Sequence, residues 1–177
     1  MAKKIPYGLT DYFRIVTEDF YYVDKTKYIE DLEKPAAFLF LIRPRRFGKS
    51  LFLNMLNCYY DVKYADRFEE LFGNQYIGKH PTAEQGKYLV LRFNFSMVRA
   101  TDDKLEAAFN RHISLETAYF ASVYASYFKP DFQEQLKLIP EAAGRLEYIC
   151  LCAKEQGLSI YLLIDEYDNF TNTILSS

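Results

Sequence analysis

From residue 43 to residue 50 the chain reads Arg43-Pro44-Arg45-Arg46-Phe47-Gly48-Lys49-Ser50. The hydrophobic run Ala36–Ile42 precedes it, and a helix-like segment that begins with Leu51 follows it. A buried strand, a tight loop with Gly-Lys-Ser and then a helix is the layout of a nucleotide phosphate loop. Without these flanks, the same residues would fit an ordinary solvated turn with a surface lysine.

The residue types in this loop suit phosphate chemistry. Gly48 lets the backbone approach an anion closely, because it has no Cβ. Lys49 would place its ammonium on the β- and γ-phosphates, and Ser50 would offer its hydroxyl to Mg²⁺. The backbone amides from Phe47 to Leu51 would cradle the β-phosphate at the start of the helix. These residues form our candidate nucleotide-binding set.

The loop departs from the common pattern Gly-x-x-x-x-Gly-Lys-Ser/Thr at its first position. That position holds Arg43, and the following Pro44 has no N–H to donate. Arg45 and Arg46 could pair with an anion or with acidic residues elsewhere in the fold. For Arg43 both interpretations stay open, and we add Arg45 and Arg46 to the candidate nucleotide-binding residues.

A second strand-like run, Tyr161–Ile164, ends in the acids Asp165 and Glu166. Asp165 would bind Mg²⁺ directly or through water, and Glu166 would be the general base that orients the attacking water. Neighbouring residues of a strand point to opposite faces, so the two acids can serve different purposes. The alternative is an exposed acidic loop, in which Asp168 fits a turn or cap. Glu166 and Lys49 are our candidate catalytic residues.

Three segments carry a resemblance to a known family. The first is the loop of residues 43–50 together with Leu51. The other two are Leu163-Ile164-Asp165-Glu166-Tyr167-Asp168 and Tyr21-Tyr22-Val23-Asp24-Lys25-Thr26. From about Ile5 to Phe170 the chain resembles the AAA-ATPase-like proteins, in which the missing first glycine is the rule. The resemblance implies an ATP-binding domain with Walker A and Walker B motifs that hydrolyses ATP with Mg²⁺. It also implies a downstream PD-(D/E)XK nuclease-like domain as a partner in the full-length protein.

A function of a different class is a nucleotide-dependent conformational switch with little turnover. Such a binding module would regulate the downstream nuclease-like domain or another effector domain. A nucleotide or small-molecule kinase is disfavoured, because it would not need a water-activating acid at Glu166.

The composition indicates a folded globular protein, because half of the 177 residues are hydrophobic, with 15 Phe and 16 Tyr. The net charge of −2 gives no sign of a nucleic-acid or membrane partner. No segment has the length of a membrane span or the pattern of a signal peptide, so we expect a cytoplasmic location. Cys58, Cys150 and Cys152 lack zinc-site spacing and are expected to be buried free thiols.

The order of elements predicts an α/β fold of the three-layer P-loop NTPase type with a parallel sheet. Residues 1–35 would be an N-terminal extension packing on the core, and residues 36–177 the nucleotide domain. In proteins of this type another strand normally lies between the two motif strands. We therefore expect a domain truncated after the Walker B strand, which could form oligomers through the gap.

The predicted elements follow from hydrophobic periodicity and from breaker residues. Tyr21 and Tyr22 are expected in the core, with stacking on a nucleotide base as the alternative. Strands are expected at 36–42, 88–96 and 160–164, and helices at 11–16, 24–32, 50–60, 66–72, 102–128, 132–138 and 141–155.

Overall fold

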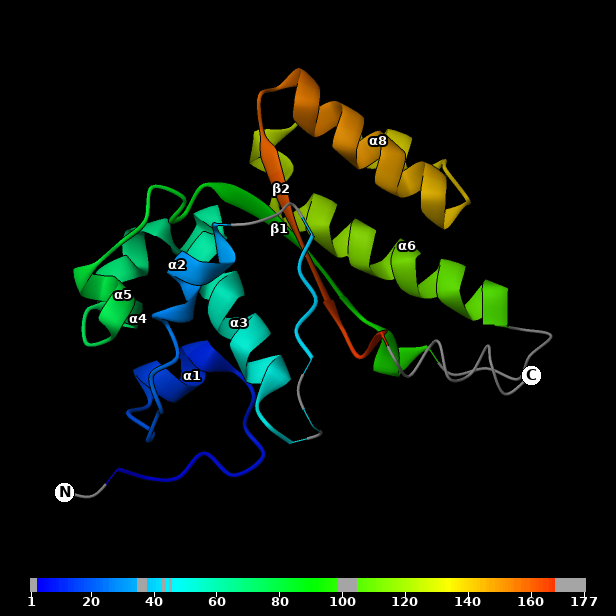
Figure 1. Cartoon of the computed structure of the whole chain (residues 1–177). Helices are drawn as coiled ribbons and strands as arrows, with labels where there is room; N and C mark the ends of the chain where they lie inside the picture. Colours follow the sequence, from blue (N-terminus) through cyan, green and yellow to red (C-terminus); the bar gives the residue numbers. More distant parts are fainter. Residues whose placement is uncertain (1–2, 35–37, 43, 45, 99–104, 168–177) are drawn as a thin grey trace. The chain divides into compact units, whose positions relative to one another are not determined.

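The computed structural model describes residues 3–34, 38–42, 44, 46–98 and 105–167. Within these residues the protein is mixed α/β, as predicted, with a two-stranded parallel sheet. The chain divides into two compact units, residues 1–87 and residues 88–177. The first unit is helical and the second contains the sheet (Figure 1). The boundary near residue 35 between an extension and a nucleotide domain stays a prediction.

The first unit is built from short helices and one longer helix, α3. This helix spans Lys49–Tyr60, close to the helix predicted at 50–60, and it buries the side chains of its second half. The shorter elements are α1 (Tyr12–Thr17), α2 (Tyr28–Leu32), the 3₁₀ helix η1 (Val62–Arg67), α4 (Phe68–Phe72) and α5 (Tyr76–Lys79).

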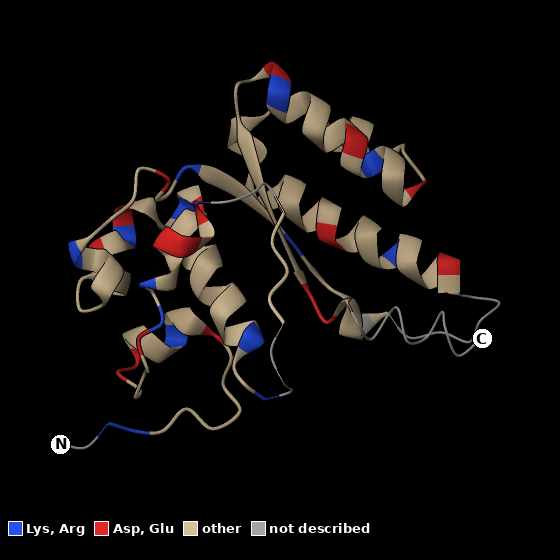
Figure 2. Cartoon of the chain, viewed as in Figure 1, with Lys and Arg blue, Asp and Glu red and all other residues tan. Residues whose placement is uncertain are grey.

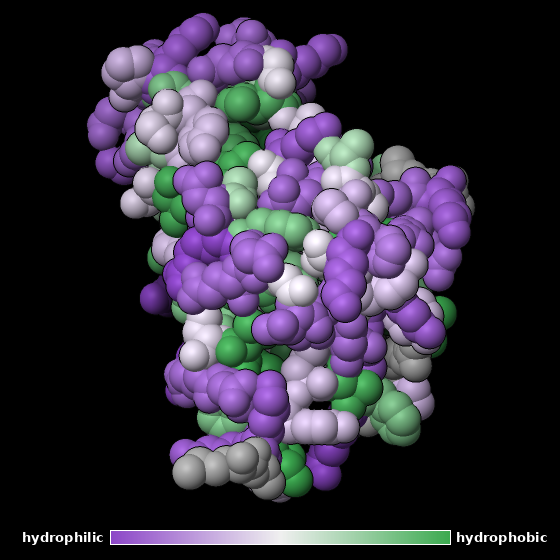
Figure 3. Space-filling model, turned by 90° about the vertical axis from the view of Figure 1, so that its left-hand side faces the viewer, coloured by the Kyte–Doolittle hydropathy of each residue, from purple (hydrophilic) through white to green (hydrophobic). Residues whose placement is uncertain are grey.

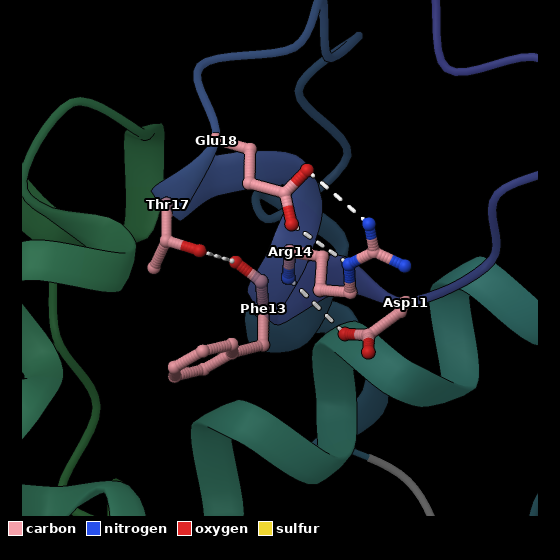
Figure 4. A network of polar contacts seen from close by, with 5 residues as sticks. All are labelled: Asp11, Phe13, Arg14, Thr17 and Glu18. Atoms are coloured by element: carbon pink, nitrogen blue, oxygen red, sulfur yellow. Dashed lines mark hydrogen bonds and ion pairs between the residues drawn. The ribbon is translucent and has the colours of Figure 1, made fainter.

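The exposed side of α1 is fixed by its own side chains (Figure 4). Asp11 caps the helix, since its carboxylate accepts a hydrogen bond from the Arg14 N–H at 3.2 Å. The Arg14 guanidinium donates to Glu18 at 2.8 Å, and the Thr17 hydroxyl donates to the Phe13 carbonyl at 2.9 Å. These local contacts satisfy the polar groups of a helix whose other side is buried in the core.

An aromatic cluster fills the core of the first unit. Tyr12 stacks on Phe72 with ring centroids 5.2 Å apart, and Tyr59 meets Phe72 edge-on at 5.4 Å. Tyr22 packs edge-on against Tyr12 at 5.1 Å, which agrees with its predicted place in the core. Tyr21 is 56% exposed, so its assignment to the core was wrong. Consecutive residues of an extended segment point to opposite sides, and only one of these two tyrosines can face inward.

A latch of polar groups joins the segment before α2 to the start of α5. One carboxylate oxygen of Asp24 accepts hydrogen bonds from the Thr26 amide and hydroxyl at 2.8 and 2.7 Å, and the other accepts from the Tyr76 amide at 2.7 Å. The buried Thr26 hydroxyl in turn accepts from the Ile77 amide at 3.1 Å. Because the latch uses Asp24 and Thr26 in this way, α2 begins at Tyr28 rather than at residue 24.

The second unit joins two parallel strands through a helical crossover, as parallel pairing requires. In the sheet, Asn94 of β1 lies opposite Asp165 of β2. Helix α6 packs against β1, and helix α8 packs against β2 (Figure 1). The elements are β1 (Tyr88–Asn94), η2 (Phe95–Met97), α6 (Leu105–Val123), η4 (Ala125–Tyr127), α7 (Phe132–Lys137), α8 (Ala142–Glu155) and β2 (Ser159–Asp165).

Charged residues of both signs are interspersed along the helices (Figure 2). On the face drawn in Figure 3, hydrophilic side chains surround smaller hydrophobic areas. This mixture accords with the small net charge of −2. No helix in the described part of the chain is long and apolar enough to cross a membrane.

The predicted strand at 36–42 is not seen in its described part. Residues 38–42 have no regular secondary structure, and Phe38 and Ile42 are 85% and 82% exposed. A hydrophobic run becomes a strand where a neighbouring strand supplies the hydrogen bonds, and the sheet of the described residues holds only β1 and β2. Ala36 and Ala37 lie outside the described residues.

The prediction that all three cysteines are buried was wrong for Cys150, which is exposed, and Cys152 is partly exposed. The reason is the periodicity of α8, because Ile149 and Ala153, one helical turn apart, occupy the inward positions. Cys58 of α3 is buried, as expected.

We predict that Thr26→Val lowers the free energy of unfolding by about 1–3 kcal/mol, because it leaves the Ile77 amide without its acceptor in the core. Urea denaturation would measure the loss. The control is Thr17→Val, which removes an exposed hydroxyl on α1 and should change stability by less than about 0.5 kcal/mol. Equal losses in the two variants would contradict the latch.

Candidate functional site

The candidate phosphate loop leads into α3 through backbone of unusual conformation. Gly48 is the residue before the helix and has φ 76°, and Arg46 has φ 65°. The Phe47 amide donates to the Pro44 carbonyl at 3.4 Å, which closes a turn. Left-handed backbone favours glycine, so Gly48 suits its position, whereas Arg46 adopts this conformation at a steric cost. Arg43 and Arg45 lie outside the described residues.

The start of α3 presents amide groups that the helix itself leaves unsatisfied. The Phe52 amide is bonded to the Gly48 carbonyl at 2.9 Å. The amides of Lys49, Ser50 and Leu51 precede it and have no carbonyl one turn earlier within the helix. Such amides, together with the positive end of the helix dipole, attract an anion.

The side chains of the loop differ in exposure. Lys49 and Ser50 are half-buried, whereas Arg46 and Phe47 are exposed. The Ser50 carbonyl accepts a hydrogen bond from the Asn54 side-chain amide at 2.9 Å, one turn along α3. The predicted loop residues from Arg46 to Leu51 therefore form one local arrangement at the start of the helix.

The far end of α3 is anchored in the core of the first unit. The Tyr59 hydroxyl accepts from the Thr82 amide at 2.8 Å and lies 3.0 Å from the Thr82 hydroxyl. Glu33 accepts hydrogen bonds from the hydroxyls of Thr82 and Tyr60 at 2.8 and 3.0 Å. Since a helix is stiff, this anchoring also fixes where its first turn lies.

In the second unit, β2 ends in a buried acid. Asp165 is 3% exposed, and one of its carboxylate oxygens accepts the Glu166 amide at 3.0 Å. The other oxygen, Oδ2, is buried without a hydrogen-bond partner among the described residues. A buried carboxylate oxygen without a donor is costly, so the site favours a cation or water there.

Two further features surround this acid. Glu166 has φ 55°, which is strained backbone for a residue with a side chain. Asn94, opposite Asp165 in the sheet, accepts hydrogen bonds from the amide and hydroxyl of Ser96 at 3.1 and 2.8 Å. Ser96 is the last residue of the strand predicted at 88–96, and Asn94 was not singled out from the sequence. The switch from hydrophobic to polar residues at the end of β1 was the signal for it. Asp168 lies outside the described residues.

The acidic pair belongs to the second unit and the loop to the first, so each is a local arrangement within its own unit. Within the described residues, no three His, Cys, Asp or Glu side chains come together as a metal-binding set. A magnesium ion needs fewer protein ligands, because it keeps water and takes phosphate oxygens. The unpartnered oxygen of Asp165 fits such a role.

A family described as "Predicted AAA-ATPase" matches residues 6–177. The chain belongs to this family. Membership accords with the resemblance found in the sequence and supports nucleotide binding, with ATP as the nucleotide that the family name indicates.

A protein of Azotobacter chroococcum mcd 1, described as "Uncharacterized protein in vnfD 5'region", is similar to part of the chain. The two are 49% identical over 55 residues, which is 30% of this chain and 11% of the relative. The match therefore spans a small part of that relative's length. No solved structure matches the chain.

We predict that Asp165→Asn leaves the metal-free protein at least as stable as the wild type, with a gain of up to about 1 kcal/mol, because it removes a buried charge that has no counter-ion among the described residues. Urea denaturation in the presence of a chelator would test this. The matched control is Asp61→Asn. Asp61 is buried as well, and its Oδ2 also lacks a hydrogen bond within the described part of the chain, but that oxygen lies 3.3 Å from the Lys63 ammonium. Its replacement removes this ion pair and should therefore be destabilising. Equal destabilisation by the two substitutions would contradict this account of Asp165.

Proposed function

We propose that this protein binds ATP with Mg²⁺ and hydrolyses it. The observation that carries the proposal is the Gly48-Lys49-Ser50 sequence at the start of α3, where left-handed backbone leads into a helix with free amides. Membership of the predicted AAA-ATPase family supports the same function.

In this proposal the loop holds the phosphates. The amides from Phe47 to Leu51 donate to the β-phosphate, and the Lys49 ammonium neutralises the β- and γ-phosphates. Arg45 and Arg46 supply further positive charge near the phosphates.

Two residues, one from each motif, are proposed to bind the metal. The Ser50 hydroxyl and the Asp165 carboxylate are the candidate ligands of Mg²⁺. When bound, Mg²⁺ neutralises charge on the phosphate oxygens. Glu166 accepts a proton from the attacking water and orients it. These roles assume a three-layer P-loop fold in which β1 and β2 are neighbouring strands of a larger parallel sheet, and this fold is part of the proposal.

The second candidate function is a nucleotide-dependent switch with little turnover, regulating a downstream nuclease-like or other effector domain. The strained backbone of Glu166 favours it, because stored strain at a ligand site is one way to make two conformations close in free energy. Turnover measurements separate the two functions.

The first test is calorimetric titration of MgATP into the wild type and into Lys49→Ala. We expect saturable binding to the wild type and a loss of affinity of about 100-fold in the variant, because a charge-assisted contact to phosphate is removed. The control is Lys79→Ala, an exposed lysine of α5 whose loss should leave the affinity unchanged. A well-folded wild type that binds no MgATP would refute the proposal.

The second test is the rate of ATP hydrolysis by Glu166→Gln. We expect kcat to fall by about 100-fold or more, with MgATP affinity retained, because the general base is lost while the phosphate contacts remain. Glu147→Gln, an exposed acid on α8, should keep the wild-type rate. If the wild type binds MgATP but never exceeds background turnover, the switch is the function and hydrolysis is not.

A further inference from the structure

A second lysine lies beside the phosphate loop. A Cβ built on Gly48 would lie 3.7 Å from the Lys25 ammonium nitrogen. Lys25 comes from the segment Tyr21–Thr26, which precedes Gly48 by more than twenty residues and belongs to the same unit. The proposed roles of the phosphate loop and of the acidic strand make no use of this segment.

The backbone that carries Lys25 is held firmly on both sides. Asp24 and Thr26 form the latch to the start of α5, through hydrogen bonds of 2.7–3.1 Å. Tyr22 is packed against Tyr12 in the aromatic core. The backbone of Lys25 is therefore held in place, and this limits the positions that its side chain can reach.

The Lys25 ammonium has no carboxylate to neutralise it among the described residues. Its neighbour Asp24 forms no ion pair with it, and the Asp24 carboxylate instead accepts the hydrogen bonds of the latch. Lys25 is also half-buried, unlike the exposed Lys27 two residues later. A half-buried lysine with no counter-ion among the described residues, beside a set of free helix amides, favours an anion between them.

We propose that Lys25 is a second phosphate-binding lysine, which contacts the polyphosphate of the nucleotide bound at the loop. This inference rests on the proposed function and adds a residue to the same site. Lys49 would approach the phosphates from the first turn of α3, and Lys25 would approach from the latched segment. The latch would thus position a ligand contact as well as supporting the fold.

A test compares Lys25→Met, Lys25→Arg and Lys27→Met by calorimetry with MgATP and with inorganic tripolyphosphate as ligands. Methionine keeps most of the hydrophobic stem and removes the charge. We expect Lys25→Met to lower the affinity for both ligands by the same factor, roughly ten- to a hundredfold, because the lost contact is to phosphate and not to the base. Lys25→Arg should stay within about threefold of the wild type, because arginine also pairs with phosphate. Lys27→Met should bind as the wild type does.

The outcomes separate this inference from the proposed function. If Lys49→Ala abolishes binding while Lys25→Met binds within about twofold of the wild type, the phosphate loop stands and the role of Lys25 is refuted. If Lys27→Met loses as much as Lys25→Met, the effect is one of net charge and the role of Lys25 is again refuted. If the folded wild type binds neither ligand, both proposals fail. Urea denaturation of Lys25→Met checks its folding, and retained affinity in Lys25→Arg supports a charge contact even if Lys25→Met is unstable.

Discussion

The position of the candidate phosphate loop depends on the burial of the opposite end of α3. Met55 and Tyr59 are fully buried and Tyr60 is 2% exposed, and each such side chain contributes about 1.5–3 kcal/mol by leaving water. A twelve-residue helix transmits that anchoring over roughly 18 Å to its first turn. The loop itself therefore needs little packing of its own, and it can leave its amides and its lysine free for a ligand.

The acidic strand is organised by a different constraint, the register of a parallel strand pair. Register places Asn94 opposite Asp165 at the carboxyl ends of both strands. Hydrophobic residues fill the middle of β1 and its neighbours, so the polar groups collect at the end, where parallel sheets commonly bind their ligands. The cost of burying Asp165 with one oxygen unpartnered is consistent with a residue selected for chemistry rather than for stability.

Local patterns were enough to predict the elements that carry the candidate residues. The helix after Gly48 and the strand before Asp165 follow from a helical period and a short hydrophobic run. Contacts between distant segments could not be predicted in this way. The Tyr76 amide donates a hydrogen bond to Asp24, and Lys25 approaches Gly48. No local sequence pattern indicates that these residues are neighbours in space. The strand predicted at 36–42 is not seen at residues 38–42 for the same reason, because hydrophobicity alone does not supply a partner strand.

The exposed run at residues 38–42 has a consequence for the behaviour of the protein in concentrated solution. Phe38, Phe40 and Ile42 are 78–85% exposed and alternate with less exposed leucines, so both sides of this run are hydrophobic. Extended hydrophobic segments of this kind are templates for pairing between molecules. Intermolecular β-sheet that begins at this run is therefore the natural route to aggregation, and a charged residue at position 40 is the natural means of suppressing it.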